Sequence, residues 1–170
     1  MREWIPISTS PKGRLALAAV QTFGGRAFDE VTVGELAAAA DVTTGAIYHH
    51  FGSKLGLYEF VREDVERRLL DRMEGALAAG SAGDASARVR GALVVGFDFA
   101  VRERFLHLLG APPAGAEDRL VALLAATTSS PVLGRVLAAG WRAALAAVAY
   151  GADPDESRAA LRALDLRLAA

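Results

Sequence analysis

The chain has 170 residues, a formal net charge of −1 at pH 7, 52% hydrophobic residues and 23% charged residues. This length fits one compact domain, or one small domain with a modest second one, and the apolar content argues against wholesale disorder. The absence of Cys excludes disulfides and thiolate metal sites. No signal-like N-terminus and no uncharged run of membrane-spanning length is found, so we expect a soluble, cytoplasmic protein with no membrane partner.

Helix-forming residues dominate the sequence, which contains 36 alanines. Apolar periodicity, Pro near helix starts and Gly after helix ends predict four helices in the first half. Their expected ranges are Lys12–Gly25, Val33–Ala40, Thr44–Phe51 and Lys54–Ala79. The last of these carries an apolar residue at every fourth position from Leu57 to Leu77, which predicts a buried stripe.

The second half is also predicted to be helical. Expected connections are Gly80–Asp84 and Gly110–Gly115, and Ser130 and Asp153 each precede Pro as predicted N-caps. The expected helices are Ala85–Leu109, Asp118–Thr127, Pro131–Tyr150 and a last one from Asp153 to Leu168. No strand-like alternation is found. The sequence therefore predicts an all-α fold: a three-helix N-terminal domain, residues 1–58 with an arm at 1–10, and a helical domain, residues 59–170.

Two short helices joined by a tight turn are predicted between Val33 and Phe51. Thr32 and Glu35 have the spacing of a capping box, and Asp41 lies in the turn, where Asp tolerates a left-handed φ. The outward face of the second short helix carries short, polar or flat residues: Thr44, Ala46, Tyr48, His49 and His50. This is helix-turn-helix geometry, whose second helix fits the major groove of DNA. A three-helix corner without a ligand is the alternative that spacing alone leaves open.

From Leu17 to Lys54 the sequence resembles the DNA-binding domain of TetR-type (tetracycline-repressor-like) transcriptional regulators. The matching positions are Ala19, Phe23, Phe28, Thr32-Val33, Leu36-Ala37, Val42, Thr44-Gly45, Ile47-Tyr48, His50-Phe51 and Ser53-Lys54. Two positions depart from the family pattern, since Ala27 and Asp41 stand where the family usually has Gly. The resemblance ends near Tyr58.

The resemblance implies a sequence-specific regulator, a repressor released from a palindromic operator by an apolar small-molecule effector, without a cofactor. The residues implied at base edges are Thr43, Thr44, Gly45 and Ala46, and those implied at the DNA backbone are Thr32, Tyr48, His49 and Lys54. It also implies a homodimer formed through the last two helices. A constitutive DNA-binding dimer without an effector is the alternative. The chain is short for the family, so a segment of the sensor half could be missing.

Charge sets a limit on how this domain binds DNA. Residues 1–58 carry five basic and five acidic side chains, so the domain has no net charge. Affinity must therefore come from a few placed cations, helix N-termini and dimerisation. We expect a modest dependence of binding on salt, because few phosphates are neutralised.

Residues 92–101 are apolar apart from Asp98, which would be costly to bury without a partner. Asp98 could face solvent, pair with Arg102, or provide a polar contact inside a ligand cavity. The candidate cavity residues are Phe97, Asp98, Phe105, His107, Leu109 and Trp141. This mixture fits an effector pocket, which is usually apolar with a few polar groups. Plain core packing is the alternative for each aromatic residue.

Small apolar residues fill the helix that begins at Pro131, and Leu161, Leu164 and Leu168 follow in the last one. So much apolar surface on a small chain indicates an interface, unless these helices close the core of one protomer. Enzyme chemistry is not expected. His49 and His50 point about 100° apart on a helix, and neither a P-loop nor a nucleophile motif occurs. No metal site is predicted.

Overall fold

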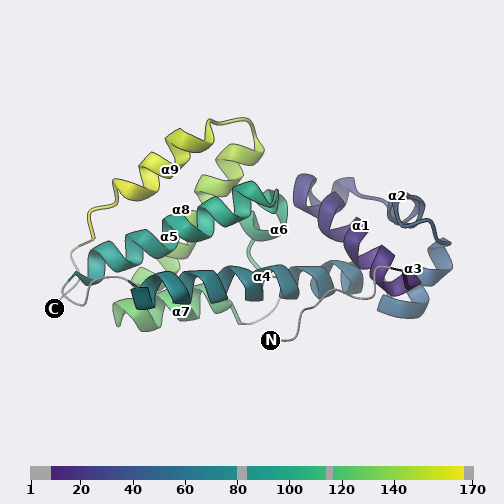
Figure 1. Cartoon of the computed structure of the whole chain (residues 1–170), viewed down its shortest axis with the longest axis horizontal. Helices are drawn as coiled ribbons and strands as arrows, with labels where there is room; N and C mark the ends of the chain where they lie inside the picture. The colour runs from purple at the N-terminus through teal and green to yellow at the C-terminus, as the bar shows by residue number, and fades with distance from the viewer. Residues whose placement is uncertain (1–8, 80–83, 114–116, 167–170) are drawn as a thin grey trace.

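The computed structural model describes residues 9–79, 84–113 and 117–166, and within these ranges it is all-α, as predicted. One 3₁₀ turn, η1 (Phe28–Glu30), follows the first helix. The α-helices are α1 (Pro11–Gly25), α2 (Val33–Ala39), α3 (Thr44–Phe51), α4 (Lys54–Ala79), α5 (Ala85–Arg102), α6 (Leu106–Gly110), α7 (Arg119–Thr128), α8 (Pro131–Ala149) and α9 (Pro154–Arg162) (Figure 1).

The long helix α4 connects the two parts of the molecule. Helices α1–α3 gather around its start, α5, α6 and α7 pack along the rest of its length, and α8 and α9 are layered over these helices (Figure 1). The predicted stripe from Leu57 to Leu77 is buried along the whole helix. Gly96 lets α5 approach closely, because a Cβ there would lie 2.9 Å from Sδ of Met73. The hydrophobic core is therefore continuous across residue 58, where the sequence suggested a domain boundary.

The prediction of one helix from Ala85 to Leu109 is wrong. Helix α5 ends at Arg102, and Arg104 adopts a left-handed φ of 61° that reverses the chain before α6. The Phe105 ring then packs on Phe99, with ring centroids 5.6 Å apart. This corner also touches α1, since a Cβ on Gly24 would lie only 2.4 Å from the Arg104 carbonyl oxygen. The close contact joins the two halves of the chain.

The last helix is shorter than predicted. Helix α9 ends at Arg162, and residues 163–166 are not helical, while residues 167–170 lie outside the described ranges. Side chains of α5 capture carbonyls of this segment: Ser86 Oγ donates to Leu166 O at 2.6 Å. Asp153 caps α9 as predicted, but its carboxylate accepts from the Asp155 N–H, and no reciprocal bond from Glu156 is found among the described residues.

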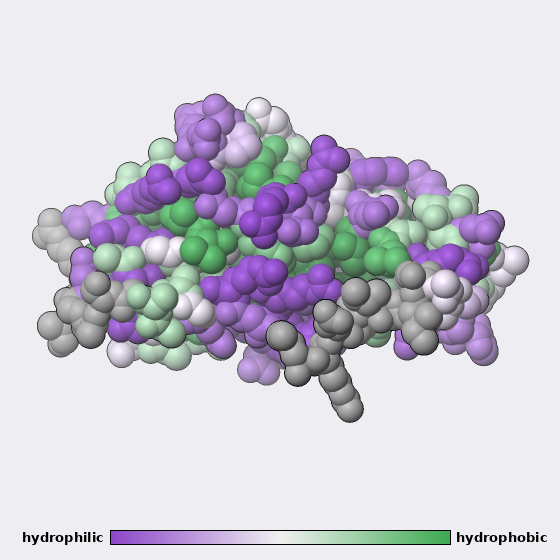
Figure 2. All heavy atoms as spheres, viewed as in Figure 1, coloured by the Kyte–Doolittle hydropathy of each residue, from purple (hydrophilic) through white to green (hydrophobic). Residues whose placement is uncertain are grey.

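Helix α8 is long and apolar enough, by length and composition alone, to cross a membrane. No segment of this kind was expected from the sequence. In this structure α8 packs against α6, α7 and α9, and 28% of the apolar window is buried. Hydrophobic residues reach the surface between α8 and α9, whereas hydrophilic residues cover the middle of α4 (Figure 2). The uncovered side of α8 is therefore an apolar surface.

Candidate nucleic-acid interface

Three aromatic rings anchor the N-terminal helices to α4. Phe23 of α1 and Phe28 of η1 each pack edge-on against Tyr58 of α4, with centroids 5.1 Å apart in both pairs. The short helices α2 and α3 add the buried side chains of Leu36 and Ile47. These contacts bury one side of each short helix, so the opposite side of α3 is left to face solvent.

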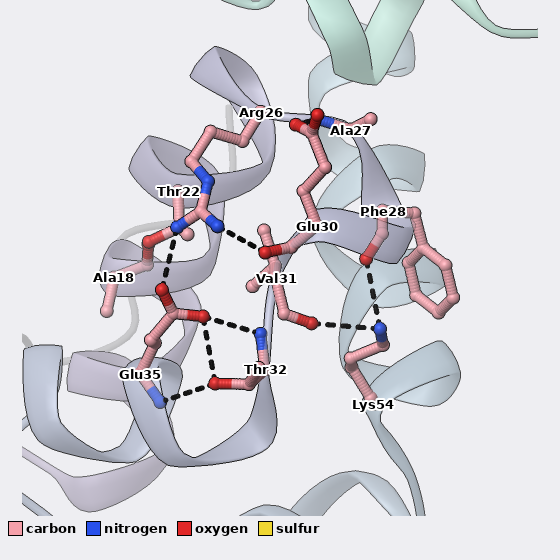
Figure 3. A network of polar contacts seen from close by, with 10 residues as sticks. All are labelled: Ala18, Thr22, Arg26, Ala27, Phe28, Glu30, Val31, Thr32, Glu35 and Lys54. Carbon is pink, nitrogen blue, oxygen red and sulfur yellow. Dashed lines mark hydrogen bonds and ion pairs between the residues drawn. The ribbon is translucent and has the colours of Figure 1, made fainter.

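A polar network fixes the start of α2 (Figure 3). The predicted capping box is confirmed: Thr32 Oγ1 accepts from the Glu35 N–H at 3.2 Å, and the Thr32 N–H donates to Glu35 Oε2 at 2.7 Å. Arg26, at the end of α1, donates to Glu35 Oε1 at 2.8 Å and to the Glu30 carbonyl. The end of α1, the η1 turn and the start of α2 are thereby held together.

The turn between α2 and α3 is held from α1. Asp41 has a φ of 51°, which confirms the left-handed conformation expected at this position. Arg14 donates through Nε to the Ala40 carbonyl at 2.9 Å and through Nη2 to the Asp41 carbonyl at 3.1 Å. A third bond runs from Arg14 Nη1 to Thr9 O at 3.0 Å. One guanidinium therefore fixes both carbonyls of the turn.

Helix α3 presents a polar, uncrowded face. Thr43 is its N-cap, but no described helix N–H donates to the Thr43 hydroxyl, which stays available to a partner. Thr43, Thr44, Gly45 and His49 are exposed, Ala46 is half-buried, and Tyr48 is 56% exposed. Helix α3 ends at Gly52, which has a φ of 76°. Six of the eight predicted DNA-contacting residues thus share one accessible surface.

The other two predicted contacts, Thr32 and Lys54, are engaged within the protein (Figure 3). Lys54 Nζ donates to the carbonyls of Phe28 and Val31 at 3.0 and 2.9 Å and lies 4.0 Å from the centroid of the Phe28 ring. The Thr32 hydroxyl is occupied by its capping partner Glu35. In this conformation both residues position the helix pair through these internal hydrogen bonds.

Arg14 and Arg26 were missed as site residues by the sequence analysis. Each binds backbone or side-chain atoms that come from another element. Arg14 bonds across 26 positions, and no local motif signals such a contact. In the sequence, Arg14 and Arg26 share only their basic character and their positions near the two ends of α1.

The predicted effector-pocket residues do not gather around one cavity. Phe97, Leu109 and Trp141 are at most 2% exposed, and the Trp141 Nε1–H donates to the Leu93 carbonyl at 3.0 Å. Phe105 is also buried. These four side chains therefore belong to the hydrophobic core. Core packing was the alternative that the sequence left open for each aromatic residue. Only His107 lines one of the described surface hollows, between α6 and the end of α8.

Asp98 follows none of the three options suggested by the sequence. Its carboxylate pairs with Arg158 of α9, at 2.8 Å from Nε and 2.7 Å from Nη2. The partner expected within the helix, Arg102, pairs instead with Glu103 at 3.1 Å. The hydrogen bond from Arg158 raises the pKa of that guanidinium further above its usual value. The pair ties α9 to α5.

Comparison with known protein families identifies the segment that carries this helix-turn-helix. Residues 16–61 match the sequence model of the family described as "Bacterial regulatory proteins, tetR family". The match spans α1–α3 and the first two turns of α4, which is the region that carries the helix-turn-helix. By this match, residues 16–61 carry the DNA-binding domain of tetR-family transcriptional regulators.

Replacing Arg14 with lysine is expected to weaken DNA binding about tenfold. Lysine keeps the charge but cannot hold two carbonyls in a fixed fork, and a net loss of roughly 1–2 kcal/mol corresponds to about a factor of ten. Titration of labelled DNA measures the affinity. Lys12→Arg, at an exposed residue of the same helix, is the matched control. Unchanged affinity of the Arg14→Lys protein would show that the hydrogen bonds from Arg14 to the turn carbonyls do not contribute to DNA binding.

Because of the Arg26–Glu35 pair, we expect the stability of the N-terminal helices to fall at acidic pH. The hydrogen bond from Arg26, followed by those from Thr32, lowers the pKa of Glu35 from 4.5 to about 2. A depressed folded-state pKa stabilises the fold above the unfolded pKa, so this contribution is lost as the pH falls from 4.5 towards 2. Glu35→Gln should therefore flatten the pH dependence of unfolding in that window. Glu59→Gln, at an exposed carboxylate of α4, is expected to leave it unchanged.

Proposed function

We propose that this protein is a homodimeric repressor that binds a palindromic operator and is released from it by a small-molecule effector. In this proposal residues 1–58 form the DNA-binding domain, and residues 59–170 form the effector-binding and dimerisation domain of a cytoplasmic regulator. The observation that carries the proposal is the exposed, polar face of α3 within a chain segment that matches the tetR family.

Helix α3 is the proposed recognition helix. Its first turn, with Thr43, Thr44, Gly45 and Ala46, has small side chains that allow the backbone to approach base edges. Tyr48 and His49 lie further along the helix and can reach phosphates of the flanking backbone. Thr32 and Lys54 act by orienting this helix, since both are bound within the protein.

The apolar side of α8 supports the proposed homodimer. Exposed residues recur every three or four positions along this helix: Val132, Val136, Gly140, Ala143 and Ala147. Val132 and Val136 are 67% and 59% exposed, which is unusual for β-branched apolar residues in a monomer. Together with exposed alanines of α9, they form a face that a second copy would cover. A two-fold axis there would place two α3 helices about 34 Å apart, one turn of DNA.

Selection from random duplex DNA tests the operator proposal. The full chain should enrich an inverted repeat whose half-sites are about one helical turn apart. Tyr48→Ala should reduce affinity for the enriched sequence, whereas Glu74→Ala, at an exposed residue in the last part of α4, should not. Enrichment of a single unrepeated site would contradict the dimer on DNA, and no enrichment would contradict sequence-specific binding.

The salt dependence of binding gives a separate test. The balanced charge of residues 1–58, with Lys54 engaged by carbonyls, leaves few cations for phosphates. We expect log K to fall with log salt less steeply than the slope of about −10 known for a highly basic repressor. Fluorescence titrations across a salt series measure this slope. A slope that steep would contradict this account of affinity.

A further inference from the structure

A crevice of about 220 Å³ opens where the helix-turn-helix end of the molecule meets the second half. Phe28 and Tyr58 form its wall on the DNA-binding side. His107 of α6 and Tyr150, which follows α8, form the opposite wall. Gly110 and Ala146 are among the small residues that complete the lining. The volume is below that of drug-sized pockets and fits a ligand built on a single ring.

The polar groups of this crevice keep hydrogen-bonding capacity that the described residues do not use. The Tyr58 hydroxyl accepts a hydrogen bond from Arg62 Nη1 at 3.2 Å, and its own proton has no acceptor among the described residues. The His107 ring nitrogens and the Tyr150 hydroxyl likewise make no hydrogen bond within the part of the chain that is described. His107 meets Tyr150 edge-on, with centroids 6.4 Å apart. Donors therefore face the crevice from both walls.

The surroundings favour an anion. No acidic residue is found among the described residues that line the crevice. Arg62 lies behind Tyr58, is 5% exposed, and donates to the carbonyls of Leu108 and Ala111, while its Nε has no hydrogen-bond partner in the described structure. Glu66 follows one turn later on α4, but burial raises its pKa and so disfavours its charged form. The positive charge of Arg62 thus remains incompletely balanced.

We propose that this crevice binds a small aromatic carboxylate, with its ring between the aromatic walls and its carboxylate at the Tyr58 hydroxyl and His107. Aromatic rings pack well edge-on or offset against other rings, and hydrogen bonds to a charged acceptor are stronger than neutral ones. A cationic ligand would lack any acidic partner in the lining.

Such a ligand contacts both halves of the molecule. Phe28 lies in η1, the turn that precedes α2, and the Lys54 ammonium lies over its ring, while His107 and Tyr150 belong to the second half. Occupation of the crevice would favour one arrangement of α3 relative to α6 and α8, and would change DNA affinity only to the extent that the ligand prefers that arrangement. This regulatory consequence rests on the proposed function; the binding site itself does not.

Benzoate and benzylamine are suitable probes, because they share a ring and differ in charge. Titration of the full chain by calorimetry, with ligand-observed NMR, should give benzoate an affinity at least about tenfold higher than that of benzylamine. Tyr58→Phe removes only the hydroxyl, and Tyr150→Ala removes an exposed ring. Each should weaken benzoate binding at least about tenfold. Tyr48→Phe, the same hydroxyl deletion on α3, should leave it unchanged.

Equal binding of the two probes, or benzoate binding that survives both crevice variants, would overturn the site. Absence of benzoate binding to the wild-type chain would overturn it as well. The effect on DNA is measured separately, with operator DNA from the selection. Benzoate binding that depends on Tyr58 but leaves operator affinity unchanged would support the crevice and contradict effector release through it. Loss of operator binding in Tyr48→Ala with normal benzoate binding would support both proposals independently.

Discussion

Ala143→Arg is expected to convert the protein to monomers and to lower operator affinity on the order of 100-fold or more, because binding of two linked half-sites is lost. Ala143 is exposed in the middle of the apolar side of α8 and lines a groove of about 410 Å³ between α8 and α9. Arginine is a good helix former, so α8 itself should tolerate it. A buried, unpaired charge at a two-fold interface would occur twice and prevent association.

Sedimentation velocity measures the change in association, and DNA titration measures its consequence. Ala122→Arg is the matched control, because Ala122 is an exposed alanine of α7 outside the α8–α9 face. This control should stay dimeric and keep its affinity. A dimeric Ala143→Arg protein would show that the two copies associate through another surface.

Trp141→Ala is expected to lower the free energy of unfolding by about 3–5 kcal/mol. Trp141 is fully buried between α8 and α5, and its Nε1–H donates to the Leu93 carbonyl. Truncation leaves a large cavity in a region without room to collapse, because Gly134 already holds α7 and α8 in close contact. A Trp lining an open effector pocket would cost much less to remove, since water or ligand would already fill the space.

Urea unfolding followed by circular dichroism measures this effect. Trp141→Phe keeps most of the packing and loses the indole hydrogen bond, so its cost should be smaller, about 1–2 kcal/mol. A loss below about 1 kcal/mol in Trp141→Ala would indicate that the side chain is not part of a closed core.

Local signals predicted most of the secondary structure. The bounds of α3 and α4 agree with the expected ranges, and the Thr32–Glu35 box and the left-handed Asp41 were both anticipated. These features depend on residues within four positions of one another. The break between α5 and α6 was missed, because Arg104 is not a residue type that normally marks a left-handed φ.

Contacts between distant residues could not be predicted from one sequence. Asp98 has a plausible partner four residues away in Arg102, yet it binds Arg158, 60 positions along the chain. The burial of the expected pocket residues was missed for a related reason. Phe97 and Trp141 are residue types found both in cores and in pocket walls, and their burial here follows from the packing of α5 against α8. The crevice at Tyr58 likewise arises from elements that meet only in the fold.

The clasp of Arg14 on the turn has a consequence for how this domain can evolve. Glycine adopts a left-handed φ most readily, and Asp is among the few other residues that tolerate it. Here a guanidinium from α1 also holds the carbonyls of Ala40 and Asp41, which adds to the local tolerance of Asp. Substitutions in the turn and in α3 can then accumulate while Arg14 keeps the orientation of α3 relative to α1.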